Sequence, residues 1–83
     1  MATKFDLDDW VIDALRQLGG SASLVDICRV IWRDHESTLR SSGDLLFTWQ
    51  YDVRWAGQKL RDTGVLRPVH GSKSYPWELA SGG

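Results

Sequence analysis

The residue types that most often carry covalent or metal chemistry are scarce and scattered in this chain. Its one thiol is Cys28, and its two imidazoles, His35 and His70, are far apart in the sequence. Neither imidazole stands at a metal-ligand spacing from the thiol. Cys28 falls on the inner side of an amphipathic segment, where a buried thiol is usually inert. We therefore expect no metal site and a structural role for Cys28.

The paired carboxylates Asp8 and Asp9 resemble the acid–base pair of a hydrolase, but their position favours a simpler role. They fall in the first turn of a predicted helix, where negative charge stabilises the helix N-terminus. No nucleophile with an adjacent base can be assembled from the remaining residues. We expect that the protein is not an enzyme and uses no cofactor and no small-molecule substrate.

Composition predicts one small globular domain over residues 1–83. The chain is 42% apolar with five Trp, which is enough for a core. Its longest apolar run is three residues, so we expect no membrane span, and the acidic start is unlike a signal peptide. A lone Cys builds no disulfide framework and is typical of a reducing, cytoplasmic location.

Charge is unevenly distributed although the net charge is only −1. Residues 1–26 carry five acidic and two basic side chains, whereas residues 48–77 carry five basic and two acidic ones. The basic part surrounds the most regular amphipathic segment. This asymmetry is modest for a nucleic-acid-binding protein.

Helical periodicity and turn residues predict three helices. The first begins with Asp6 as N-cap, carries a hydrophobic staple between Phe5 and Trp10, and ends at Gly19-Gly20. A short strand at Ser21-Ala22 follows. Ser23 caps the second helix, which is expected to fade between Asp34 and Leu39.

The second half of the chain contains the helix around which the domain is organised. After an irregular loop over Glu36–Phe47, Thr48 caps the third helix and Gly64 ends it. Strands over Val65–Val69 and Tyr75–Leu79, joined by residues 70–74, complete the order. The third helix buries one apolar stripe, made of Trp49, Val53, Ala56 and Leu60.

Helix, strand, helix, helix, strand, turn, strand is the order of a winged helix-turn-helix, an α+β fold in which three helices carry a small antiparallel sheet and wing. In addition, Leu-Gly-Gly-Ser-Ala-Ser (18–23) and Val53-Arg54-Trp55-Ala56 followed by Leu60 and Gly64-Val65-Leu66 resemble the N-terminal winged-helix domain of Mrr-type restriction endonucleases. The resemblance covers roughly residues 7–80. It implies a DNA-binding, restriction-associated module.

Members of that family carry a separate nuclease domain after the winged helix. Residues 1–83 contain no Glu-x-Lys, so the metal-dependent cleavage of the family has no residues here to carry it.

The main functional prediction is binding of double-stranded DNA, with the third helix in the major groove and the wing on the backbone. Arg54 is suited to guanine or phosphate, and Gln50 to a base edge. Small polar residues and a Lys at the wing tip suit phosphate. The predicted nucleic-acid-binding residues are Gln50, Tyr51, Arg54, Gln58, Arg61, Arg67, His70, Ser72 and Lys73. The alternative for these charges is an ordinary solvated surface.

A second functional class remains open, a protein-interaction module that uses the same scaffold without DNA. Tyr51 and Trp55 lie opposite the buried stripe of the third helix, and exposed aromatic residues often anchor protein interfaces. Trp55 is expected to be covered by residues 36–47 or by the wing; otherwise it is an exposed anchor.

Overall fold

The computed structural model describes residues 2–68 and 76–80. The described chain is an α+β domain of three helices and a two-stranded antiparallel sheet, and at this level the predicted fold class is confirmed. It measures 35 × 20 × 20 Å. The elements are α1 (Asp6–Gln17), β1 (Ser21–Ala22), α2 (Leu24–Arg40), α3 (Leu45–Asp62) and β2 (Trp77–Glu78).

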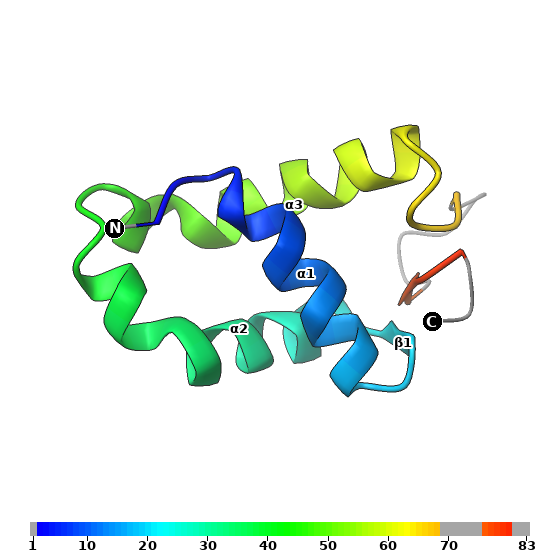
Figure 1. Ribbon diagram of the computed structural model, residues 1–83, viewed down its shortest axis with the longest axis horizontal. Helices are drawn as coiled ribbons and strands as arrows, with labels where there is room; N and C mark the ends of the chain where they lie inside the picture. The colour runs from blue at the N-terminus through cyan, green and yellow to red at the C-terminus, as the bar shows by residue number, and fades with distance from the viewer. Residues whose placement is uncertain (1, 69–75, 81–83) are drawn as a thin grey trace.

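The two longer helices, α2 and α3, run along the length of the molecule, and α1 crosses between them (Figure 1). The sheet lies at one end of this arrangement. The start of the chain lies at the other end, where the Ala2 amide donates to the Ser42 hydroxyl at 2.9 Å in the α2–α3 connection. The outer face of α3 is left exposed, and it includes Gln50, Tyr51 and Arg54.

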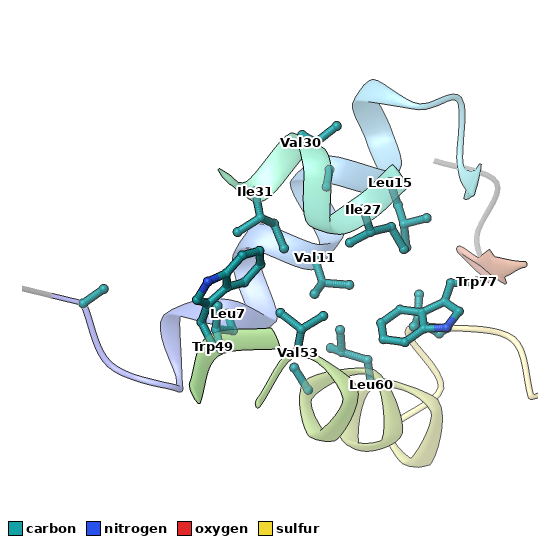
Figure 2. Close-up of a cluster of buried hydrophobic side chains, with 14 of the residues drawn as sticks. Leu7, Val11, Leu15, Ile27, Val30, Ile31, Trp49, Val53, Leu60 and Trp77 are labelled. Atoms are coloured by element: carbon teal, nitrogen blue, oxygen red, sulfur yellow. The ribbon is translucent and has the colours of Figure 1, made fainter. Parts of the chain in front are cut away.

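A single apolar core joins the three helices (Figure 2). The predicted stripe of α3 is confirmed, since each of its four side chains is at most 6% exposed. Side chains from α1 and α2 meet that stripe. The fully buried residues are Leu7, Val11, Leu15, Ile27, Ile31, Leu39, Val53 and Leu66.

Three predicted helix boundaries are confirmed by backbone geometry. The Ser23 hydroxyl accepts from the Asp26 amide at 3.2 Å and caps α2. After α3, Gly64 has φ +83°, the left-handed conformation that an L side chain rarely adopts. Gly19 and Gly20 likewise have positive φ after α1.

The predicted start of α1 is wrong. The cap position is Phe5, which makes no side-chain cap hydrogen bond, and Asp6 is already helical. The Asp6 carboxylate instead accepts from the Thr3 amide at 2.9 Å within the preceding turn. Phe5 is 66% exposed, so it forms no hydrophobic staple with Trp10.

The irregular loop predicted over residues 36–47 is also wrong. Helix α2 continues to Arg40, where an i,i+4 ion pair with Glu36 at 2.8 Å supports the last turn, and α3 begins at Leu45. Leu39 and Leu45 are buried while helical. Thr48 is therefore inside α3, and its hydroxyl donates to Asp52 instead of capping the helix.

The predicted antiparallel pairing of the two C-terminal segments is confirmed at Leu66 and Leu79, but it is shorter than expected. Over residues 65–68, a single bridge from Leu66 to Leu79 replaces the expected strand. β2 pairs with β1, with Ala22 opposite Trp77. The predicted alternation holds for the described part of the second strand, because Trp77 and Leu79 are buried and Glu78 is exposed. The turn at residues 70–74 and Tyr75 lie outside the described residues.

Candidate functional site

The outer surface of α3 divides into a polar stripe and an aromatic stripe that adjoin along the helix. We define the polar stripe as Gln50 and Arg54 with the exposed Arg29 beside them on α2. All three line a groove of about 500 Å³ between α2 and α3, whose apolar side includes Trp32 and Trp49. These two indoles are stacked, with ring centroids 5.9 Å apart.

Arg54 is the most available cation of this stripe. Among the described residues, none of the ion pairs involves its guanidinium, whereas Arg29 pairs with Asp26 at 3.6 Å. Cys28 lies in the same groove. Burial raises the pKa of its thiol and the Arg54 charge opposes that rise. Neutral Cys28 therefore contributes an apolar surface, consistent with its predicted structural role.

Arg61, predicted to contact nucleic acid, has a structural position. Its guanidinium lies 5.0 Å from the Trp77 ring centroid, and its Nε is buried without a hydrogen-bond partner among the described residues. Trp77 also packs on Gly57, where an added Cβ would lie 2.6 Å from the Trp77 ring atom Cζ3. Arg61 and Gly57 thus hold β2 against α3.

Carboxylates interact with two of the other predicted contacts, Gln58 and Arg67, and also with Lys59. Lys59 Nζ lies 2.8 Å from Asp8, Arg67 Nε lies 3.6 Å from Glu78, and Gln58 donates to Asp62 at 3.0 Å. His70, Ser72 and Lys73 lie outside the described residues. The structure therefore brings together Gln50 and Arg54, and it does not join Arg54, Arg61 and Arg67 into one free basic band.

The aromatic stripe consists of Phe47, Tyr51 and Trp55, one turn apart on α3. They are 84%, 63% and 60% exposed. The Tyr51 and Trp55 rings meet edge to face, with centroids 6.2 Å apart. The expectation that residues 36–47 cover Trp55 is wrong, because residues 36–40 belong to α2 and residues 45–47 to α3. The other expected cover, the tip of the wing, lies outside the described residues.

Phe47 was not among the predicted site residues. In the sequence, Phe47 stands four residues before Tyr51 and eight before Trp55, a spacing that places all three on one helix face. This spacing could have identified Phe47 only if the predicted helix had included residue 47. A second groove of about 450 Å³ lies between this stripe and the start of α1. Its lining includes Lys4, Phe5, Tyr51, Trp55 and Lys59.

No candidate metal site is found in the part of the chain that the structure describes. It contains no cluster of three or more His, Cys, Asp or Glu side chains that could hold a metal ion. His35 stacks on Trp10 with ring centroids 3.8 Å apart, which assigns it to packing between α1 and α2. No described helix is long and apolar enough to cross a membrane.

Comparison of the chain with protein-family models, curated proteins and solved structures finds no match. The resemblance to the Mrr-type winged-helix domain therefore remains a prediction from the quoted residues.

Proposed function

We propose that this protein is a winged-helix module that binds double-stranded DNA through α3. The observation that carries the proposal is the exposed pair Gln50 and Arg54, in the first three turns of α3, beside the N-terminal half of α2. In helix-turn-helix proteins these parts of the second and third helices face DNA. The element order and the antiparallel sheet are compatible with that family of folds.

In this proposal each polar side chain has one task. Arg54 donates to guanine or to a phosphate, and Gln50, nearer the helix N-terminus, reaches a base edge. Arg29 contacts the backbone from α2. The predicted wing residues, His70, Ser72 and Lys73, add backbone contacts.

Affinity should be weak and sensitive to salt. The net charge is −1, and carboxylates already pair with Lys59 and Arg67. A protein that neutralises few phosphates releases few counterions on binding.

The aromatic stripe supports a second candidate function, the binding of a protein partner. Phe47, Tyr51 and Trp55 form an exposed apolar surface with Arg54 at its edge. Aromatic and Arg side chains dominate interface energetics, and contiguous apolar patches on a monomer are uncommon. This candidate needs no free basic band.

A titration of wild type with a random-sequence duplex, followed by fluorescence anisotropy at low and moderate salt, tests the DNA proposal. We expect binding at low salt that weakens steeply as salt rises. Absence of binding at the lowest salt would exclude the DNA proposal and leave the protein-interaction candidate.

A further inference from the structure

The groove between α2 and α3 has an apolar lining that the DNA proposal does not use. That proposal assigns roles only to the polar side chains of the groove, although most of the lining residues are apolar. The groove has a volume of about 500 Å³, which is in the range of pockets that bind small molecules. Its apolar lining includes Leu24, Cys28 and Trp32 from α2, and Leu46 and Trp49 from α3.

Two Trp side chains form the aromatic part of this groove. Because α2 and α3 run in opposite directions (Figure 1), Trp32 in the middle of α2 meets Trp49 in the first half of α3. Their rings are stacked, with centroids 5.9 Å apart and 10° between the ring planes. An indole is a favourable contact for a further planar ring, either offset-stacked or edge to face.

Two Arg side chains form a basic part of the groove next to the Trp pair. Cys28 stands one turn of α2 before Trp32, and Arg29 follows it directly. Arg54 of α3 lies close enough to Cys28 that its charge opposes the rise in the pKa of the thiol that burial causes. The thiol itself stays neutral and does not repel an anion.

The charge in the groove is positive. Among the described residues, no carboxylate lines it. Arg29 pairs with Asp26 at 3.6 Å, and Asp26 lies outside the lining. Arg54 takes part in none of the ion pairs in the described part of the chain. Counting Asp26 against Arg29 leaves the charge of Arg54, which is complementary to a ligand with one negative charge.

We propose that the groove between α2 and α3 is a binding site for a small aromatic carboxylate. The ring of the ligand packs on Trp32 and Trp49, and its carboxylate accepts hydrogen bonds from the Arg54 guanidinium. A guanidinium matches a carboxylate with two parallel N–H···O bonds. Gln50, one turn before Arg54 on the same helix, supplies a further donor.

The dimensions of the groove favour a small molecule over a peptide. Along α2 the lining runs from Leu24 to Trp32, which is roughly 12 Å of helix. This length accommodates two fused rings and a carboxylate, whereas a docked peptide helix would need a longer groove.

The ligand site overlaps the proposed DNA surface at Gln50 and Arg54, so the aromatic carboxylate and duplex DNA should exclude each other. That exclusion rests on the proposed function. The ligand site itself goes beyond the proposed function and does not depend on it.

2-Naphthoate is the probe, added to the isotopically labelled full chain and followed by NMR. We expect saturable shifts at the indole N–H groups of Trp32 and Trp49 and at the side chain of Arg54. For a ligand of this size the dissociation constant should be on the order of 10⁻⁴–10⁻³ M. 2-Naphthamide, which has the same rings without the charge, should bind about 3- to 10-fold more weakly. Acetate, which has the charge without the rings, should cause no saturable shifts.

A matched pair of variants tests the role of Arg54. Arg54→Gln should weaken binding of 2-naphthoate by about 3- to 10-fold and change binding of 2-naphthamide by less than about 2-fold. Arg16→Gln, at an exposed position of α1, is the control and should bind both probes as wild type does. Circular dichroism checks that both variants are folded.

Four results would overturn the inference: no saturable shifts with 2-naphthoate, equal affinities for 2-naphthoate and 2-naphthamide, an equal loss of both in Arg54→Gln, or shifts confined to the second groove at Tyr51 and Trp55. A chain that binds duplex DNA but not 2-naphthoate would reject the ligand site alone. A chain that binds 2-naphthoate in this groove but not duplex DNA would reject the proposed function alone.

Discussion

At the scale of single residues, Gly57 and Leu60 show how α3 supports the rest of the domain. Gly57 makes room for the Trp77 ring, and Leu60 is 6% exposed within the buried stripe. The Leu60 carbonyl also accepts from the Val65 and Leu66 amides, at 2.9 and 3.1 Å. One turn of α3 thus determines both the core packing and the path of the chain after the helix.

Gly57→Ala is expected to destabilise the protein although Ala is the better helix former. Helix propensity favours Ala by about 1 kcal/mol, whereas overpacking against Trp77 costs about 1–3 kcal/mol. Thermal unfolding followed by Trp fluorescence measures the difference. Gln58→Ala, at the exposed neighbouring position, serves as the control. A Gly57→Ala variant more stable than wild type would show that Trp77 does not pack on α3.

Leu60→Ala should cost about 2–5 kcal/mol through lost burial and the cavity that remains. A small domain holds only about 5 kcal/mol or somewhat more, so much of the variant should be unfolded at 37 °C. Tyr51→Ala, at an exposed position of the same helix, should change the free energy of unfolding by about 0.5 kcal/mol or less. Equal denaturant midpoints for the two variants would mean that the buried and exposed faces of α3 are misassigned.

At the scale of elements, the periodicity of the sequence correctly predicts which helix face is buried, but it does not predict where the helices begin and end. Trp49, Val53 and Leu60 share a face because helix geometry is local, and the Gly64 turn follows from backbone sterics at one residue. Residues 36–47 were misread because Ser41-Ser42-Gly43-Asp44 is a turn of only a few residues between two helices. Because the third helix is predicted to begin at Thr48 and α3 in fact begins at Leu45, the prediction does not place Phe47 on the exposed face of the helix.

The remaining wrong predictions concern contacts between residues that are far apart in the sequence. β1 pairs with β2, residues 21–22 with 77–78, and no local pattern selects that partner. Arg61 is spaced like a surface residue, yet its contact with Trp77 follows from the return of the chain after residue 75. The candidate DNA contacts Gln50 and Arg54 were predicted from the helix face, whereas the compensation of Lys59 by Asp8 depends on α1 packing.

A hydrogen-bond network on the surface between α1 and α2 predicts how the stability of the fold changes at low pH. Arg33 donates to Asp34 at 2.9 Å, and so does Gln17, from α1, also at 2.9 Å. The Arg33 and Gln17 hydrogen bonds hold the pKa of Asp34 at about 2, below its ordinary 3.8. A lowered folded-state pKa stabilises the fold above pH 3.8, and this stabilisation is lost as pH falls through about 2.

The Asp34→Asn variant should therefore lose less thermal stability than wild type as the pH falls from about 4 to about 2. The effect should be small and should shrink at high salt, since the network is exposed. Melting curves across this pH range measure it. Parallel curves for wild type and variant would show that the network does not form in solution.

At the scale of the whole molecule, the three helices leave one long surface uncovered, the outer face of α3. One side of that face is polar and borders α2, and the other is aromatic and borders the start of α1. The proposed function and the second candidate function assign these sides to different partners, duplex DNA and a protein. Both require α3 to be exposed over its first three turns.

The proposed contact between Arg54 and a guanine base predicts a specific effect of Arg54→Ala. A bidentate Arg–guanine contact contributes roughly 1–3 kcal/mol of discrimination, so the variant should lose preference among duplexes with a smaller loss on random DNA. Arg16→Ala, on α1 and also exposed, is the matched control and should bind as wild type does. Binding selected from a random duplex pool compares all three proteins. A uniform loss across sequences would make Arg54 a phosphate contact.

The most direct test of the central claim maps the DNA-contacting surface by NMR. Amide and side-chain resonances of the labelled protein are followed while a short duplex is added at low salt. The account predicts shifts concentrated at Arg29, Gln50 and Arg54, and their disappearance as salt is raised. No shifts at these three residues at the lowest salt, or shifts confined to Phe47, Tyr51 and Trp55, would contradict it.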